Sequence, residues 1–267
     1  VWVTESKKIL EDNDMIRKPD MDTLELMEYQ EKLFTLGTKT EVDTLLRGGV
    51  KPECLYEVYG EFGSGKTQFC LTLSAEAISQ GHEIVWIDCE DTFRPRRLAE
   101  IIVARGYAID TEDAKQHLKN IHYYYCPNTE QMMGKVNALS PLLTEHKPKL
   151  VILDGAIGQF REEYLGRGTL AERQNQIAHL MTHLKNISYY FNCTVLFTNQ
   201  VQSDPSIMFG DPVKPIGGHV VGHAPTYRMY FKKSGRKHIA RMVDSPEDPV
   251  ADIQFDLTDK GITDVET

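Results

Sequence analysis

An eight-residue segment, residues 60–67 (GEFGSGKT), fits the pattern G-x-x-x-x-G-K-[ST] at every position. The pattern indicates a phosphate-binding loop only where a strand precedes it and a helix follows it. Residues 55–59 (LYEVY) are typical of a short strand, and residues 68–79 carry apolar side chains without Gly or Pro, as a helix would. Because strand, glycine-rich turn and helix follow in this order, the segment predicts a binding loop for a nucleoside triphosphate.

This loop offers both backbone and side-chain ligands to a nucleotide. Its glycines let the backbone curl so that N–H groups face the phosphates, and we expect Lys66 to reach the β- and γ-phosphates. The Thr67 hydroxyl is expected to hold Mg²⁺. The alternative, a glycine-rich turn with an exposed lysine, does not account for the flanking strand and helix. The predicted nucleotide-binding residues here are Gly60, Glu61, Phe62, Gly63, Ser64, Gly65, Lys66 and Thr67.

Carboxylates end two further predicted strands. Asp154 closes the apolar run LVILD, and an aspartate at this place in phosphate-loop enzymes orients Mg²⁺, usually through water. A turn-capping role is the alternative. Hydrolysis of ATP also needs a group that orients the attacking water. Glu90 is the candidate, although the sequence alone does not choose among Asp88, Glu90 and Asp91.

The order of the predicted elements indicates an α/β fold with a mostly parallel central sheet and helices on both faces. Residues 200–218 are rich in Gly, Pro, Asp and Ser, which is typical of a binding loop or a disordered segment. Residues 226–265 alternate apolar and polar side chains about a Ser234-Gly235 turn, so we expect an antiparallel hairpin extending one sheet edge. Further strands are predicted at 83–88, 121–126, 150–154 and 194–199, a long helix at 170–191, and an acidic N-terminal arm or linker at 1–33.

Charge and cysteine content limit the function classes. The formal net charge of −9 argues against a protein that coats nucleic acid through bulk charge. Residues 211–243 nevertheless contain one acidic residue and seven lysines and arginines, which fits either a groove for a polyanion or the solvated face of a hairpin. The five scattered cysteines indicate buried reduced thiols in an intracellular protein, and no apolar run reaches the ~20 residues of a membrane helix.

Four blocks of sequence together resemble the RecA/RadA-type DNA recombinase family, with the closest match to archaeal RadA and its eukaryotic counterparts. They are residues 60–68 (GEFGSGKTQ), 87–97 (IDCEDTFRPRR), 160–174 (FREEYLGRGTLAERQ) and 209–223 (FGDPVKPIGGHVVGH). The resemblance implies a RecA-like P-loop NTPase core over residues 34–267, with two DNA-binding loops at about 160–174 and 201–218. Location would be the cytoplasm or nucleoid in an archaeon, or the nucleus in a eukaryote.

The resemblance also implies a function. It is that of a DNA-dependent ATPase and recombinase that uses ATP and Mg²⁺, forms an ATP-dependent filament on single-stranded DNA, and promotes homologous pairing and strand exchange. Its partners would be single-stranded DNA, double-stranded DNA and further copies of itself, with no membrane. The alternative is a recombinase paralogue that acts as an ATP-binding mediator or adaptor without strand exchange of its own.

Individual roles follow from the matching positions. Glu90 would activate water, Gln200 would sense the γ-phosphate, and Arg97 would lie against the adenine. His223 would lie near the phosphates of the adjoining subunit. Lys66 and Gln200 join Glu90 as catalytic residues, and Gln68 joins the nucleotide-binding loop. The DNA-binding residues would be Arg161, Tyr164, Arg167, Arg173, Gly217 and Gly218.

The sequence departs from the family pattern at several positions. Gly155 replaces a serine, from which we expect weaker hydrogen bonding near the metal, while Asp91 replaces a glycine and Pro225 a serine. The sequence contains neither a small helical N-terminal domain nor a Phe-x-x-Ala motif before the phosphate loop, through which most relatives dock neighbouring subunits. We therefore expect weakened filament contacts, or contacts made by other arm residues such as Leu24, Leu26 and Met27.

Overall fold

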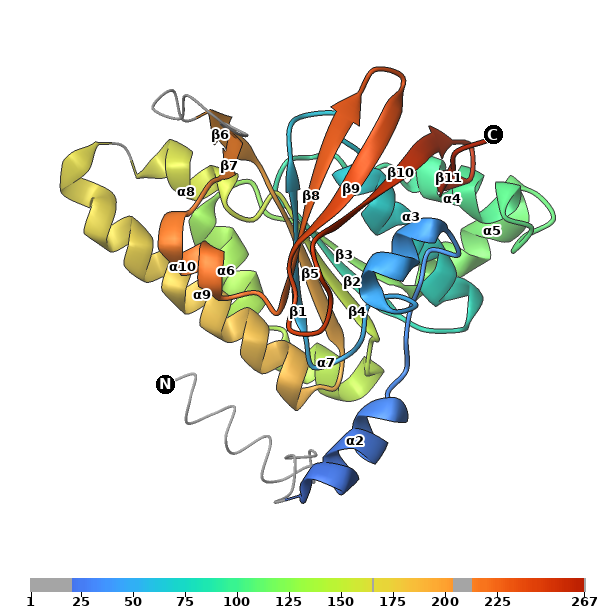
Figure 1. The fold of residues 1–267 in the computed structure, drawn as a ribbon, viewed down its shortest axis with the longest axis horizontal. Helices are drawn as coiled ribbons and strands as arrows, with labels where there is room; N and C mark the ends of the chain where they lie inside the picture. Colours follow the sequence, from blue (N-terminus) through green and yellow to red (C-terminus); the bar gives the residue numbers. More distant parts are fainter. Residues whose placement is uncertain (1–20, 165, 204–212, 267) are drawn as a thin grey trace.

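The structure is a computed structural model that describes residues 21–164, 166–203 and 213–266. Its centre is a nine-stranded sheet in the order β11-β10-β9-β8-β1-β5-β4-β2-β3 (Figure 1). The neighbouring strands β8, β1, β5, β4, β2 and β3 are parallel to one another, and β9, β10 and β11 continue the sheet with antiparallel pairing. The strands are β1 Leu55–Gly60, β2 Ile84–Asp88, β3 Ile121–Tyr125, β4 Leu150–Asp154, β5 Thr194–Asn199, β8 Tyr227–Ser234, β9 Lys237–Asp244, β10 Ala251–Thr258 and β11 Gly261–Asp264.

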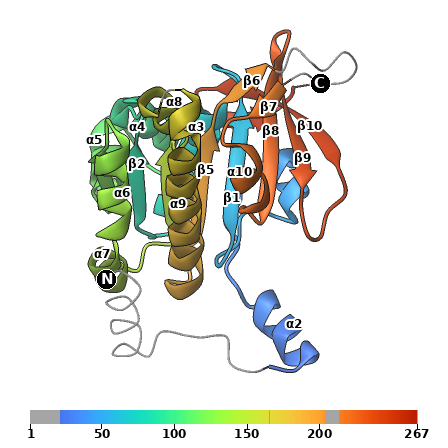
Figure 2. The same ribbon diagram turned by 90° about the vertical axis from the view of Figure 1, so that its left-hand side faces the viewer.

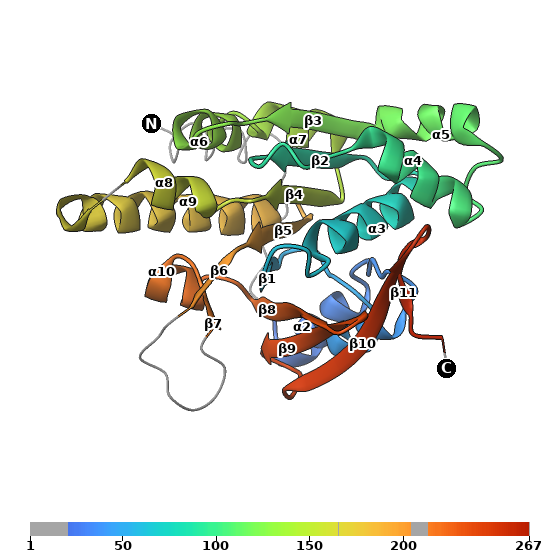
Figure 3. The same ribbon diagram turned by 90° about the horizontal axis from the view of Figure 1, so that it is seen from above.

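Helices cover both faces of the sheet, which Figure 3 shows edge-on between two helical layers. This arrangement confirms the predicted α/β class with a mostly parallel sheet. One layer contains η1 Glu41–Leu46, α3 Lys66–Ser79, α4 Pro95–Ala104 and α5 Thr111–His117, with η2 Leu118–Asn120 after it. The other contains α6 Thr129–Asn137, α7 Ser140–His146, α8 Gly158–Glu163, η3 Arg167–Thr169, α9 Leu170–Tyr190 and α10 Gly218–His223.

The apolar strands fill two separate cores. Along β4, Ile152 packs into the core under α3 and α4, whereas Val151 and Leu153 pack into the core under α6 and α9. Successive strand residues point to opposite faces, so a strand covered on both sides needs a continuous apolar run. In α9, the apolar residues from Ile177 to Ile187 form one stripe, and this stripe packs into the core under α6 and α9.

The carboxyl-terminal strands extend the sheet further than the sequence predicted. The expected hairpin is present as β8 and β9, with Ser234 opposite Lys237 at its turn. Strands β10 and β11 then continue the sheet beyond it. The phosphate-loop strand β1 therefore lies between β5 and β8, inside the sheet, with its carboxyl end surrounded by neighbouring strand ends.

The predicted second DNA loop begins and ends in a small ribbon that sequence analysis did not anticipate. Strands β6 Val201–Ser203 and β7 Val213–Pro215 pair antiparallel, with Val201 opposite Pro215. Residues 204–212 between them lie outside the described residues. The first predicted loop is also more regular than expected, because α8 extends to Glu163 and α9 begins at Leu170.

In the part of the arm that the structure describes, from residue 21 onward, α2 Thr23–Glu31 lies apart from the sheet at the lower end of Figure 1. Asp22 and Glu25 form a capping box at its start, and within α2 no side chain is buried. The predicted arm is therefore helical over Thr23–Glu31. In the described part of the chain, no helix combines the length and apolarity needed to cross a bilayer.

Candidate nucleotide and DNA-binding site

Three positions of the phosphate loop favour glycine because of their backbone conformation or their close packing. Gly63 and Gly65 adopt φ of 73° and 101°, in the left-handed region that favours glycine. A Cβ on Gly60 would lie 2.0 Å from the carbonyl oxygen of Phe231 on β8. The loop therefore connects β1 to α3, which begins at Lys66, as the sequence pattern predicted.

Lys66 lies over the mouth of this loop. Its Nζ donates to the carbonyl oxygens of Gly60 and Glu61, each at 2.9 Å. Burial lowers the pKa of Lys66, while the nearby carboxylates of Glu90 and Asp154 act to raise it. The ammonium group is thus held by two loop carbonyls near two acidic side chains, and its positive charge is what could attract a phosphate here.

Asp154, at the end of β4, is buried and accepts three threonine hydroxyls. The donors are Thr67 at 3.1 Å, Thr92 at 3.0 Å and Thr198 at 2.5 Å. Burial raises the pKa of Asp154, and these hydrogen bonds act against the rise by stabilising the carboxylate. The two predicted metal residues, Thr67 and Asp154, therefore lie in contact, and their oxygen donors fit Mg²⁺.

The weaker hydrogen bonding expected from Gly155 is not what the structure has. Asp154 keeps three donors, and the Gly155 N–H itself donates to Thr198 Oγ1 at 2.8 Å. Sequence analysis missed Thr92 and Thr198, because each comes from a different strand or loop and carries no pattern of its own. For Thr198, the only signal in the sequence was its position near the end of a predicted strand, directly before Asn199.

The three acidic residues after β2 have different surroundings. Asp88 is fully buried and accepts the backbone N–H groups of Glu90, Thr92 and Phe93 at 3.0–3.2 Å. Asp91 is exposed, with its carboxylate 3.6 Å from Arg94. Only Glu90 of the three lines the pocket beside the phosphate loop. Its role as the water-orienting group stays a prediction.

Glu90 is also in contact with Gln200. The Gln200 Nε2 donates to Glu90 Oε1 at 2.7 Å. The pocket that both side chains line has a volume of about 380 Å³, and its wall combines Gly60, Glu61, Phe62, Lys66, Glu90, Gln200, Val201 and Val213. Part of the phosphate loop, Glu90, Gln200 and one residue from each strand of the β6–β7 ribbon therefore share one cavity.

Arg97 and His223 lie outside the lining of this pocket. Arg97 Nε donates to Gln68 Oε1 at 3.0 Å, and its guanidinium also donates to the carbonyls of Thr258 and Asp259. It thus connects α4 to the turn between β10 and β11. His223 ends α10, where its ring stacks on that of His219. The role predicted for His223 involves a neighbouring subunit and stays a prediction.

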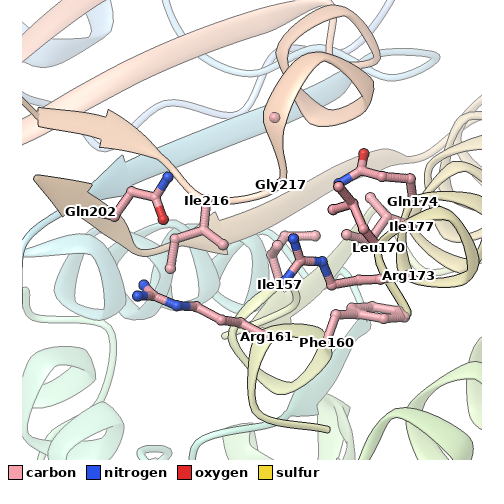
Figure 4. A pocket seen from close by; sticks show the side chains of 11 residues that line it. Ile157, Phe160, Arg161, Leu170, Arg173, Gln174, Ile177, Gln202, Ile216 and Gly217 are labelled. Atoms are coloured by element: carbon pink, nitrogen blue, oxygen red, sulfur yellow. The ribbon is translucent and has the colours of Figure 1, made fainter. Parts of the chain in front are cut away.

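A second pocket brings together residues from both predicted DNA loops (Figure 4). Arg161 of α8 and Arg173 of α9 both line it, and Gly217 and Gly218 close it from the side of α10. Its volume is about 240 Å³, and its apolar wall comprises Ile157, Phe160, Leu170, Ile177 and Ile216. The loops are therefore adjacent, as a single groove for a polynucleotide requires.

The other predicted DNA residues are placed less directly. The Tyr164 ring stacks on Phe160 with centroids 6.3 Å apart, and Arg167 lies in η3, where only its backbone is described. Gly217 has a φ of 108°, and a Cβ there would lie 2.3 Å from the Val221 side chain. Glycine is thus required at position 217 for α10 to begin, and this requirement does not depend on any close approach to DNA.

Two arginines of the basic segment at residues 211–243 have different surroundings. Arg228 forms a buried ion pair with Glu57, at 2.7 Å, and Arg241 pairs with Asp252 on the next strand. Asn199 Nδ2 donates at 2.8 Å both to Glu57 and to the carbonyl of Ile216. Burial raises the pKa of Glu57, against the effect of Arg228. Sequence analysis missed this network, although an acid inside the apolar strand LYEVYG was a signal.

These features are those of a RecA-like core, in which the phosphate-loop motif, Asp154 with its three threonine donors, and Gln200 lie at the carboxyl edge of the sheet. The family model described as Rad51 matches residues 30–265, and the chain belongs to this family. The chain is also 39% identical, over 272 aligned residues, to the "DNA repair and recombination protein RadA" of Cenarchaeum symbiosum (strain A). The alignment covers 99% of this chain and 67% of that relative.

Proposed function

We propose that this protein is a DNA-dependent ATPase and recombinase that assembles on single-stranded DNA as an ATP-dependent filament. In this role it promotes homologous pairing and strand exchange in recombinational DNA repair, inside the cell, with double-stranded DNA as the second partner. Membership of the Rad51 family and similarity to a protein named for DNA repair and recombination support the proposal. Residues 34–267 would form the catalytic core, and residues 1–33 an arm.

One observation carries the proposal. The pocket beside the phosphate loop is also lined by Gln200, Val201 and Val213, where the second predicted DNA segment begins and ends. Gln200 is bonded to Glu90 and directly precedes β6. A γ-phosphate that accepts a hydrogen bond from the Gln200 amide would compete with Glu90 for this donor, and the change would reach the ribbon within one residue. Nucleotide state could thereby bias the DNA segment, as in other switch segments.

The proposed roles combine this arrangement with the family resemblance. Lys66 would bind the β- and γ-phosphates, Thr67 and Asp154 would hold Mg²⁺, and Glu90 would orient the attacking water. Bound Mg²⁺ would supply charge neutralisation at the phosphate oxygens. Gln200 would sense the γ-phosphate, Arg97 the adenine, and His223 the neighbouring subunit's nucleotide. DNA would be held by Arg161, Tyr164, Arg167, Arg173, Gly217 and Gly218.

The coupling is tested by the affinity for a fluorescent single-stranded oligonucleotide, measured by anisotropy at fixed salt. We expect at least about tenfold tighter binding with a non-hydrolysable ATP analogue than with ADP or no nucleotide, which corresponds to about 1.4 kcal/mol of coupling. Equal affinity in all three states would contradict the proposal. Formation of D-loops with ATP tests strand exchange separately.

A mediator paralogue is the second candidate. It is favoured by the departures from the family pattern at Gly155 and Pro225 and by the missing Phe-x-x-Ala motif in the arm. The two candidates differ in phosphate release, which single-stranded DNA should stimulate in a recombinase and leave nearly unchanged in a mediator. Nucleotide-dependent DNA binding without D-loop formation or stimulated hydrolysis would favour the mediator.

A further inference from the structure

A cluster of three metal-ligating side chains lies far from the nucleotide pocket. Glu83 directly precedes β2, His122 is on the edge strand β3, and His146 is the last residue of α7. In Figure 2, α7 lies at the lower end of the molecule, whereas α8, β6 and β7 lie at the upper end. The cluster is thus at the opposite end of the strands from the phosphate loop, and none of the roles above uses it.

The three side chains converge on one point. Glu83 Oε2 lies 2.5 Å from His122 Nε2 and 2.9 Å from His146 Nδ1. One ligand atom from each of the three residues lies within 4.8 Å of the others, and the two imidazole centroids are 4.4 Å apart. Tetrahedral zinc with bonds of about 2.0–2.1 Å needs ligand atoms about 3.3 Å apart. Both separations from the Glu83 oxygen are shorter than this value, so side-chain rotations that move the ligand atoms apart by about 0.4–0.8 Å would make room for the ion.

The backbone positions of His122 and Glu83 are fixed by pairing within and beside the sheet, and His146 ends α7. His122 is paired with Val85 in the register of β2 and β3, and the Glu83 carbonyl accepts the Lys149 N–H at 3.0 Å. The side chains of His122, Glu83 and His146 are 20%, 34% and 35% exposed. They are therefore held by three elements, yet an ion can reach them and retain water on its remaining positions.

The donor set decides which ion fits. Two imidazole nitrogens with one carboxylate oxygen is a combination that zinc accepts, with water as the fourth ligand. Mg²⁺ and Ca²⁺ prefer oxygen ligands, so imidazole disfavours them. Without a metal, one carboxylate oxygen of Glu83 lies within hydrogen-bond distance of one ring nitrogen of each imidazole. On binding, each ring would carry its remaining proton on the other nitrogen.

We propose that Glu83, His122 and His146 form a binding site for a borderline transition-metal ion, Zn²⁺, that connects α7 to the edge strand β3. The ion stabilises the folded chain in proportion to its occupancy, because the unfolded chain does not hold the three ligands together. The site acts independently of nucleotide and DNA.

The test is zinc titration of metal-stripped protein by calorimetry, without nucleotide or DNA. We expect one site in the wild type, and at least about tenfold weaker binding in His146→Ala and in Glu83→Gln, since loss of a ligand costs no less than loss of an outer partner. His179→Gln, which removes an exposed histidine on α9, is the matched control and should bind as the wild type does. Saturating zinc should raise the wild-type Tm by about 5 °C or more.

A second variant separates metal binding from simple hydrogen bonding. In His146→Asp the new carboxylate reaches a place similar to Nδ1 but repels Glu83, so its Tm should fall without metal and recover with zinc. A lowered Tm that zinc does not restore would show a hydrogen-bonded cluster only. Absence of a wild-type site, or equal zinc affinity in wild type and His146→Ala, would overturn the proposal. ATP analogue binding, retained in all variants, checks that they fold.

Discussion

The buried ion pair between Glu57 and Arg228 gives the sharpest test of how this sheet is held together. Glu57 lies on β1 directly opposite Arg228 on β8, and their side chains are 0% and 12% exposed. Removing one partner of such a pair leaves an uncompensated buried charge, which costs about 3–5 kcal/mol. We therefore expect Arg228→Met to lower the free energy of unfolding by about that amount at pH 7.

The pH dependence of this cost has a defined sign. Burial raises the pKa of Glu57 in the folded protein, and removal of Arg228 raises it further. An acid whose folded pKa exceeds its unfolded pKa destabilises the fold at high pH, and the penalty is relieved as pH falls through the folded pKa. The destabilisation by Arg228→Met should consequently be smaller at pH 5 than at pH 7.

Urea unfolding followed by circular dichroism measures both effects. Arg241→Met is the matched control, since it makes the same substitution on the neighbouring strand but breaks a pair whose side chains are 35% and 40% exposed. Exposed pairs contribute about 0–1 kcal/mol. The double variant Glu57→Gln/Arg228→Met removes both charges and should recover part of the loss. A cost for Arg228→Met no larger than that of Arg241→Met would refute the argument from burial.

Other predictions concern the proposed functional residues. Lys66→Ala should abolish binding of a fluorescent ATP analogue, whereas Glu90→Gln should leave binding intact and slow phosphate release by at least tenfold; a normal turnover rate in Glu90→Gln would remove Glu90 from the role of base. Arg161→Ala and Arg173→Ala should each weaken oligonucleotide binding and reduce the slope of log affinity against log salt by about 1, and an unchanged slope would place these arginines away from the phosphates. Thr198→Val removes a donor that stabilises the Asp154 carboxylate, so the pKa of Asp154 should rise further and the acid limb of the pH–activity profile should move to higher pH; an unmoved limb would contradict this reasoning.

The parts of the fold that sequence predicted are those with local signals. The phosphate loop, the long helix α9 and the buried runs of β2, β4 and β5 are each defined by neighbouring residues in the chain. Thr198 and Arg228 act through partners 44 and 171 residues away in sequence, Asp154 and Glu57. No local sequence pattern predicts such a contact, because the contact depends on strand order. Strand order in turn follows from the packing of the whole sheet.

Two departures from the family pattern gain a physical account from the backbone. Asp91 has a φ of 52°, in the left-handed region where glycine is favoured and aspartate is tolerated. The backbone conformation therefore accounts for the glycine of the family pattern at this position. Gly155 has a φ of 86°, and a Cβ there would lie 2.4 Å from Glu90 Cγ. The glycine thus admits Glu90 to its contact with Gln200. Since Asp154 keeps its three hydroxyl donors, this substitution bears on the proposed sensing contact rather than on the metal position.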